Sequence, residues 1–338
     1  MSKDIPGQLT VIVPTWNGEQ LLRTCLLSLQ LQTVSCSVLV VDNGSTDSTL
    51  ELVCSEFPEV DYLPLERNFG FAKAVNLGIQ RARSEFVALL NNDTEVNPHW
   101  VEAGLKAFER HPDYWFFASK MLDFRRRDTV DSAGDCYGRT GLPRKRGLGE
   151  PANQFTQTAP VMGASAGAAF YRKDLFERIG LFDEGFFLYL EDVDLSLRAQ
   201  FSSLPCLYLP EAIVYHVEAA SDPDRSNSNP ISPSAKGAET RTAESARTYY
   251  SQNRVFWITR NRWQLMITYQ LLRNAPWLVL GWARSALFHL LKAGFFGAFL
   301  KGLVAGILLT PRALGKRKKV WAERTLATSQ VCQLIAKC

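Results

Sequence analysis

The chain has 338 residues and a formal net charge of +4, and 46% of its residues are apolar. This length exceeds that of one typical core, so it predicts one large domain with an appendage, or two domains. So mild a charge does not indicate a nucleic-acid partner, and the seven cysteines show neither a CxxC pair nor the spacing of a metal site. We interpret them as small buried hydrophobes in a reducing compartment. The N-terminal segment lacks a signal-peptide core, so we expect the bulk of the chain to stay in the cytoplasm.

Strand-like and helix-like runs alternate along the first third of the chain. Short β-rich runs predict strands at 9–13, 36–44, 60–66, 85–90 and 114–119. Helical spacing of apolar residues predicts helices at 19–32, 71–83 and 98–110. A further helix is expected after Ser48, where the sequence to Glu51 is typical of a capping box. This alternation predicts an α/β fold with a mostly parallel sheet and helices on both of its faces.

Polar clusters follow four of the predicted strands. They are "PTWNG" (14–18), "DNGSTD" (42–47), "RNFGFAKA" (67–74) and "NNDT" (91–94). In sheets of this kind ligands bind outside the carboxyl ends of the strands. One such cluster is typical of a turn, whereas four on one edge, each with an acid, a base or an aromatic, indicate a binding site.

Longer motifs surround these clusters. They are "VIVPTWNG", "VVDNGSTDSTLEL", "RNFGFAKAVNLGI", "LLNNDTEVNPHW" and "GLFDEGFFLYLEDVDLSLRA". In this order, from about Thr10 to His216, they resemble the inverting family 2 glycosyltransferases, and within them the rhamnosyltransferase-like enzymes of bacterial cell-surface polysaccharides. The resemblance implies the nucleotide-sugar-binding GT-A fold and a divalent cation, Mg²⁺ or Mn²⁺, as cofactor.

The first two clusters would bind the base of the nucleotide sugar. The resemblance implies that Asp42 accepts a hydrogen bond from a pyrimidine N3–H and that Thr15 and Trp16 border the base, where Trp16 offers a stacking face. An Asx-turn at Asp42 and ordinary loop packing at Trp16 are the structural alternatives, and Gly44 fits both interpretations. We include the neighbouring Pro14 and Asn17 in this nucleotide-binding set.

The third cluster supplies the cations Arg67 and Lys73, which are suited to phosphate, although a solvated surface role for Arg67 is an equal alternative. Gly70 permits a backbone conformation that other residues resist. Asn68 would either hydrogen-bond the nucleotide or cap the next helix.

The fourth cluster carries the candidate metal ligand, Asp93. Mg²⁺ and Mn²⁺ take hard oxygen ligands, with phosphate and water completing the shell. Many relatives have two acids here, whereas this chain has Asn91 and Asn92, so we expect it to bind metal more weakly without substrate. We count both asparagines among the residues that bind the donor, with Asn91 as a contact to the sugar. His216 follows a strand-like run and is either structural or, as in some relatives, a further metal ligand.

The run "YLEDVDLSLRAQF" (189–201) predicts an amphipathic helix with three acids in its first turn. Negative charge is favoured there by the helix dipole alone. The resemblance implies that Asp192 is the base that deprotonates the acceptor and that Glu191 helps to position acceptor or sugar. Asp194 would cap the helix or pair with Arg198, four residues on.

Two Gly-rich segments come between these motifs. Gly167, in "GASAGAAF" (163–170), lies in an element that the resemblance places near the donor sugar, and a tightly packed strand is the alternative. The basic loop 137–151 would either fold over the diphosphate or form a surface loop.

The boundaries that we predict divide the chain into four segments. These are 1–120, the nucleotide-sugar-binding half of the GT-A domain; 121–218, its acceptor-side half; 219–248, a flexible linker or lid; and 249–338, a helical, membrane-interfacial region.

The last segment is apolar at 276–311, but Arg284, Lys292 and Lys301 interrupt it, so no charge-free window reaches about 18 residues. We predict interfacial or re-entrant helices on a membrane, with core packing or dimerisation as the alternative. The basic run at 312–324 suits an anionic leaflet. The three arginines that precede the apolar part would meet an acceptor phosphate or form a solvated face; they are Arg254, Arg260 and Arg262.

Taken together, these features predict an inverting transfer of a sugar, with rhamnose as the leading candidate, from a dTDP- or UDP-sugar to a lipid-linked saccharide at the cytoplasmic face of the cell membrane. Two alternatives stay open. A sugar nucleotidyltransferase would use a similar sheet, but "PTWNG" stands where its GxGxR loop belongs. A non-catalytic membrane scaffold would not need the acids. The sequence does not indicate the oligomeric state.

Overall fold

The computed structural model describes residues 8–217 and 251–336. Ten strands form one mixed sheet in the order β10-β12-β6-β11-β4-β1-β2-β3, with β5 paired to β12 and β7 paired to β6, and β8 and β9 form a separate hairpin. The strands are β1 (Leu9–Thr15), β2 (Ser37–Asp42), β3 (Asp61–Pro64), β4 (Phe86–Leu90), β5 (Thr94–Val96), β6 (Phe116–Asp123), β7 (Val130–Ser132), β8 (Asp135–Tyr137), β9 (Pro143–Lys145), β10 (Ala159–Val161), β11 (Ala168–Arg172) and β12 (Cys206–His216).

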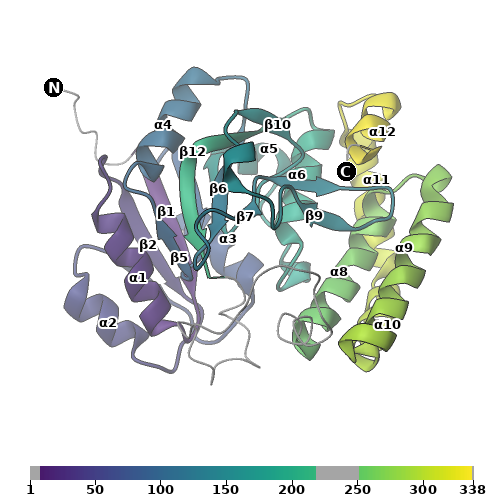
Figure 1. The fold of residues 1–338 in the computed structure, drawn as a ribbon, viewed down its shortest axis with the longest axis horizontal. Coiled ribbons are helices and arrows are strands. Elements are labelled where there is room, and N and C mark those ends of the chain that lie inside the picture. The colour runs from purple at the N-terminus through teal and green to yellow at the C-terminus, as the bar shows by residue number, and fades with distance from the viewer. Residues whose placement is uncertain (1–7, 218–250, 337–338) are drawn as a thin grey trace.

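Helices pack on both faces of this sheet and extend to one side of it (Figure 1). They are α1 (Glu19–Gln30), α2 (Thr49–Glu56), α3 (Phe71–Arg81), α4 (Trp100–Arg110), α5 (Asp174–Ile179), α6 (Glu191–Phe201), α8 (Gln252–Tyr269), α9 (Ala275–Phe288), α10 (Phe296–Leu308), α11 (Thr310–Glu323) and α12 (Thr328–Ala336). Short 3₁₀ or π turns are η1 (Ala152–Gln154), η2 (Glu184–Phe186), η4 (Leu272–Asn274) and η5 (His289–Ala293).

The parallel half of the sheet is built as the sequence predicts. Strands β3, β2, β1 and β4 are parallel neighbours, and every residue of β1 is buried. Successive side chains of β1 point to opposite faces: Val11 and Val13 belong to the core on the side of α1 and α4, and Ile12 to the core on the side of α3. The carboxyl ends of these strands therefore share one edge, where the polar clusters lie.

The second half of the sheet is mixed. β11 is inserted antiparallel between β4 and β6, while β12 runs parallel to β6 and pairs antiparallel with the short β5. The segment 163–170, for which a strand was the alternative, contributes its last residues to β11. This arrangement brings the end of β12 against the turn that follows β4.

Some local expectations differ from the structure. Ser48 stands before α2 but makes no side-chain cap; the Asp47 carboxylate accepts the Thr49 N–H instead, at 3.2 Å. Cys54 is exposed and Cys136 is disulfide-bonded, so the interpretation of all cysteines as small buried thiols is wrong for these two. The predicted linker 219–248 lies outside the described residues.

The C-terminal helices form a layer beside the acceptor-side half, at the end of the molecule away from α1 and α2 (Figure 1). Helix α8 contacts both α10 and α11. Gly302 and Gly306 of α10 allow close approach, since a Cβ at Gly306 would lie 2.7 Å from the Trp263 Cβ on α8. One face of the apolar segment therefore packs within the protein.

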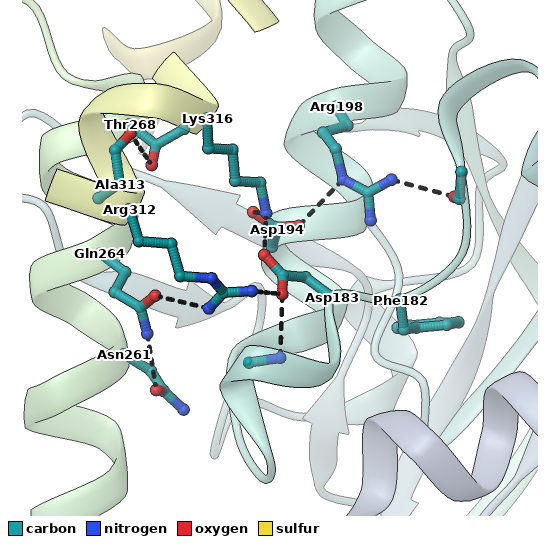
Figure 2. A network of polar contacts seen from close by, with 12 residues as sticks. Phe182, Asp183, Asp194, Arg198, Asn261, Gln264, Thr268, Arg312, Ala313 and Lys316 are labelled. Atoms are coloured by element: carbon teal, nitrogen blue, oxygen red, sulfur yellow. Dashed lines mark hydrogen bonds and ion pairs between the residues drawn. The ribbon is translucent and has the colours of Figure 1, made fainter. Parts of the chain in front are cut away.

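Part of the basic run at 312–324 pairs with groups of the protein itself, so only its other cations, among them the exposed Lys318 and Lys319, stay available for the predicted contact with a membrane surface. Figure 2 shows Arg312 and Lys316 of α11 reaching Asp183 and Asp194. The Lys316 Nζ lies 2.6 Å from an oxygen of each carboxylate. Arg317 donates to three backbone carbonyl oxygens around the end of α8.

Asp194 is the buried centre of this network. It accepts from Arg198 Nε at 3.0 Å and from the Tyr269 hydroxyl at 2.8 Å, in addition to Lys316. The predicted pairing of Asp194 with Arg198 is confirmed. Because an unpaired charge at this site would be costly, α6 and α11 are tied together by charge as well as by packing.

The network predicts how stability depends on pH. Burial raises the pKa of Asp183, but Lys316 and Arg312 outweigh it and lower that pKa to about 2 from an ordinary value of 3.8. A carboxylate with a lowered folded-state pKa stabilises the protein above the unfolded value and loses this contribution, about 2 kcal/mol, as the pH falls from about 4 toward 2. Lys316→Met should lower the free energy of unfolding by about 1–3 kcal/mol at pH 7 and make its decline below pH 4 shallower. Urea unfolding between pH 7 and 2.5 measures both.

Lys319→Met provides the control, because Lys319 is exposed on the same helix. Lys319→Met should leave the dependence of the unfolding free energy on pH unchanged. Identical acid profiles for the wild type and Lys316→Met would show that the ion pair does not contribute.

Candidate functional site

Asp93 and His216 face each other where the turn between β4 and β5 meets the end of β12. Pairing of β12 with β5 sets His216 opposite Thr94, the neighbour of Asp93, and the Val217 N–H donates to the Asp93 carbonyl at 3.0 Å. Both side chains are buried, and the His216 Nε2 lies 3.3 Å from Asp93 Oδ1. The structure therefore brings the two predicted metal ligands together.

A second carboxylate, which sequence reasoning missed, orients the histidine. Asp131 on β7 lies 2.9 Å from His216 Nδ1 and 2.7 Å from the Nζ of Lys145 on β9. Burial lowers the pKa of His216, but the carboxylates of Asp93 and Asp131 outweigh it and raise this pKa to about 10. Asp93, His216, Asp131 and Lys145 thus form a buried chain of alternating charge.

The chemistry of this chain fits a divalent cation. Carboxylate oxygens suit Mn²⁺ and Mg²⁺, and His216 would serve as a further ligand only after a bound cation displaces the proton that its raised pKa keeps on the ring. A histidine that ligates a metal usually gives its other ring nitrogen to a carboxylate, as His216 does with Asp131. Within 8–217 and 251–336 there is no group of three His, Cys, Asp or Glu residues that could hold an ion. Further ligands would have to come from substrate phosphate and water.

The two catalytic candidates lie in the first turn of α6. Asp192 is half-buried, and its Oδ2 accepts from the Ala166 N–H at 3.2 Å. Glu191 is buried, and its Oε2 has no hydrogen-bond partner among the residues that the structure describes. Burial raises the pKa of both carboxyl groups, and the charge of Asp192 raises that of Glu191 further. Neither acid is simply a solvated residue at a helix terminus.

Asp135 and Lys145 link the two centres. They are cross-strand partners in the β8–β9 hairpin, and Asp135 is buried. Burial and the charge of Asp192 raise the pKa of Asp135, while Lys145 lowers that of both Asp135 and Asp192. Lys145 therefore pairs with Asp131 on the histidine side and acts electrostatically on Asp192. The basic loop 137–151 contributes this cation to the site rather than forming only a surface loop.

The backbone makes a second connection. Asn91 donates its N–H to the Gly167 carbonyl at 2.9 Å, next to Ala166, which binds Asp192. A Cβ at Gly167 would lie 3.2 Å from the Asn91 amide nitrogen. Asp93 and Asp192, about a hundred residues apart in the sequence, thus belong to one continuous polar cluster.

The nucleotide-binding candidates connect the strand-end loops. Asp42 Oδ1 accepts from the Ser45 N–H at 2.8 Å, which is the Asx-turn alternative, while its Oδ2 accepts from the Tyr62 hydroxyl, a partner that the sequence did not indicate. The buried Thr15 hydroxyl accepts from Asn92 Nδ2 at 2.9 Å. Pro14 lies in β1 beside β2, Asn17 Oδ1 accepts from the Thr46 N–H at 2.7 Å, and Trp16 is half-buried next to them.

The third loop is held by Asn68 and by the buried Asn43 of the second loop, whose Oδ1 accepts from the Phe69 N–H at 2.9 Å. Asn68 Oδ1 accepts from the Gly70 N–H at 2.9 Å, so this side chain stabilises the turn before α3. Lys73 pairs with Glu184 at 3.1 Å, and Arg67 lies over the ring of Phe69. A Cβ at Gly44 would lie 2.5 Å from the Arg67 Cα, so the second and third loops are in close contact.

The arginines of α8 do not form a solvated face, and their contact with an acceptor phosphate stays a prediction. Arg262 is buried and donates to the carbonyl oxygens of Thr140 and Gly141, each at 3.0 Å. Arg254 is also buried, and Arg260 donates to the Gly185 carbonyl at 2.9 Å. These cations hold loops of the acceptor-side half.

The model of the family described as "Glycosyl transferase family 2" matches residues 10–180. The chain belongs to this family. An N-acetylglucosaminyl-diphospho-decaprenol L-rhamnosyltransferase of Mycobacterium tuberculosis is 30% identical over 237 residues, which cover 63% of this chain and 77% of that protein. The amylovoran biosynthesis glycosyltransferase AmsE of Erwinia amylovora is 26% identical over 219 residues, which cover 63% of this chain and 77% of that protein.

Solved structures agree on the fold. The structure of GalNAc-T7 with UDP, GalNAc and Mn²⁺ matches with a TM-score of 0.60 at 13% identity, covering 90% of this chain and 58% of that one. The structure of S. aureus TarS 1-349 in complex with UDP matches with a TM-score of 0.52 at 19% identity, covering 94% of this chain and 89% of that one. The predicted GT-A fold and the rhamnosyltransferase-like type within family 2 are confirmed.

Gly70 offers a test of the contact between the third loop, which we assign to the donor and call the donor loop below, and the segment that carries the acids. Its φ is +88°, and a Cβ there would lie 2.5 Å from the Phe187 carbonyl oxygen. Gly70→Ala should lower the free energy of unfolding by about 3–4 kcal/mol, the sum of backbone strain and overpacking. Gly149→Ala is the matched control, because Gly149 has a φ of +81° with no atom near its would-be Cβ. Gly149→Ala should lower the free energy of unfolding by about 1 kcal/mol. Equal losses in denaturant unfolding would contradict the close approach.

Proposed function

We propose that this family 2 member is a metal-dependent, inverting glycosyltransferase of cell-surface polysaccharide synthesis. It would move a sugar, with rhamnose as the leading candidate, from a dTDP- or UDP-sugar to a lipid-linked saccharide. The observation that carries the proposal is that the ion chain through Asp93 and His216 lies beside Asp192, because Asn91 bonds to Gly167 and the adjacent Ala166 N–H bonds to the Asp192 carboxylate. The relative from M. tuberculosis, whose name specifies a decaprenol-linked acceptor and L-rhamnose, supports the choice of substrates.

In the proposed reaction Asp192 takes the proton of an acceptor hydroxyl. The hydroxyl oxygen then bonds to the anomeric carbon, the bond from that carbon to the diphosphate oxygen breaks, and its electron pair leaves with the nucleoside diphosphate. A base works best when its pKa lies near the working pH, and burial moves the pKa of Asp192 upward in that direction. The Ala166 N–H fixes one oxygen of this carboxylate.

The leaving-group side would be served by Asp93 and His216. These two residues would hold the divalent cation, which when bound offsets the charge that develops on the diphosphate. Asp131 keeps the His216 Nε2 directed at Asp93, and Lys145 adds a fixed positive charge. Glu191, buried without a partner among the described residues, would position the acceptor or sugar.

Asp192→Asn tests the assignment directly. The variant should bind nucleoside diphosphate with Mn²⁺ as the wild type does, but sugar transfer to lipid-linked acceptor in membrane extracts should fall by at least about 100-fold, because an amide cannot accept the proton. Calorimetry measures the binding, and release of nucleoside diphosphate measures the transfer. Release of pyrophosphate by the wild type would favour a nucleotidyltransferase. Undiminished function of the variant in cells would favour a scaffold.

The C-terminal helices carry the second part of the proposal, attachment to the cytoplasmic face of the membrane. Among the described residues no single helix is long and apolar enough to cross a bilayer. The pair α10 and α11, bent by 58° at their junction, is the one combination there whose joint length and composition would suffice. Large apolar side chains are nevertheless exposed along this region. Those on α9, η5 and α10 are Trp277, Val279, Leu280, Leu287, Leu290, Leu291, Phe296, Leu300, Val304, Ile307 and Leu308.

Charge complementarity favours an anionic lipid surface as the occupant of this apolar region. Arg273, Arg284 and Lys301 are exposed on the same helices and turns, next to the apolar side chains. Apolar side chains that enter the interface beside basic residues are typical of interfacial helices. A lipid-linked acceptor would also bring its sugar to this surface.

Leu300, Val304 and Ile307 form an exposed stripe on α10, at spacings of four and three residues. Replacing all three by Gln should reduce binding to vesicles that contain anionic lipid by at least about tenfold, since the buried apolar area is lost. Leu27→Gln on α1 with Leu31→Gln directly after it is the control, because these side chains are similarly exposed and α1 lies at the opposite end of the molecule. Vesicle co-sedimentation measures both. If the triple variant sediments with the vesicles as the wild type does, the proposed attachment to a membrane is refuted. Deleting the helices would be a poorer test, because Lys316 would be lost with them.

A further inference from the structure

The turn directly before the catalytic candidates has an unfavourable backbone. Phe187, Tyr189 and Leu190 have φ values of +63°, +67° and +69°, in the left-handed region that residues with a side chain rarely adopt. Leu190 immediately precedes Glu191, and no side chain caps the helix there. The direction of the first turn of α6, and with it the position of Asp192, therefore depends on a conformation that the local sequence does not favour.

One side chain from another part of the chain holds this turn. Asn261 of α8 is fully buried, and the two hydrogens of its Nδ2 are shared among the carbonyl oxygens of Phe186, Leu188 and Tyr189, at 2.9, 2.9 and 2.8 Å from the nitrogen. Its Oδ1 accepts from Arg260 Nη1 at 2.7 Å, which fixes the orientation of the amide. The three carbonyl groups point at one donor because the turn is wound tightly around it.

The turn is also confined on its other side. The Phe187 carbonyl lies against Gly70 of the donor loop, and the Phe187 ring stacks on Trp257 of α8 with ring centroids 4.8 Å apart. The turn is thus fixed between the loop assigned to the donor and the C-terminal helices.

We infer, building on the proposed function, that Asn261 is a positioning residue for the acceptor-activating carboxylate: it holds the turn 186–190 so that Asp192 faces the acceptor hydroxyl. Asn261 then contributes to catalysis through the turn that it holds, rather than by contact with the reacting atoms. Small misplacement of a reacting group costs up to about 100-fold in rate, so loss of this support should appear in kcat.

The test uses the full-length protein and Asn261→Leu, which keeps the approximate volume and removes the donors. We expect kcat to fall about 10- to 100-fold, while the Kd for nucleoside diphosphate with Mn²⁺ stays within about threefold and the calorimetric stoichiometry stays at one. In an Asp192→Glu background the carboxylate is already displaced. Asn261→Leu should there reduce kcat by a much smaller factor than in the wild type, because the effects of two residues that act through one group are not additive. Should Asn261→Leu fail to fold, Asn261→Ser, which keeps one hydroxyl donor, takes its place with a smaller expected loss.

Thr259→Ala is the matched control. Thr259 is buried on the same helix but faces Gly302 of α10. It should lower the melting temperature and leave kcat per active site unchanged. The inference is overturned if Asn261→Leu loses no more kcat per active site than Thr259→Ala, or if its loss is the same with Glu at position 192. A wild type that releases no nucleoside diphosphate refutes the proposed function itself, which separates the two failures.

Discussion

The buried ion chain from Asp93 through His216 and Asp131 to Lys145 is the interaction on which the site depends. Each of these charges would be costly alone in the interior, and each is compensated only because four separate segments meet there. The pairing of β12 with β5 delivers the histidine, and β7 and the β8–β9 hairpin deliver the carboxylate and the lysine. A sheet register shifted by one residue would turn His216 away and leave the acids unpaired.

The C-terminal helices belong to the same structural unit as the acids. Lys316 on α11 pairs with Asp194 on α6, Arg262 on α8 holds the loop that leads to Lys145, and Asn261 holds the turn before Glu191. These contacts are made by buried or half-buried polar groups, so removing either partner leaves the other unsatisfied. One face of these helices thus fixes the catalytic candidates, while the other exposes the apolar surface assigned to the membrane.

The sequence predicted what depends on local pattern. Periodicity indicated the parallel strands, and their shared edge located Asp42 and Asp93 before any contact was known. Asp131 and Asn261 could not be found in this way, because their roles come from pairing with segments about 75 to 85 residues away in the chain. The same limit explains Lys316: a run of cations looks like a surface until the buried carboxylates opposite it are seen.

The cluster around Asp192 is poorly optimised for stability. Glu191 is buried without a hydrogen-bond partner among the described residues, and three residues before it have left-handed backbones. Strain and unpaired charge of this kind persist only where the surroundings impose them, which here means α8 on one side and the donor loop on the other. Because the loop that contains Gly70 and helix α8 hold the same turn, a displacement of either one would move the first turn of α6 and with it Asp192.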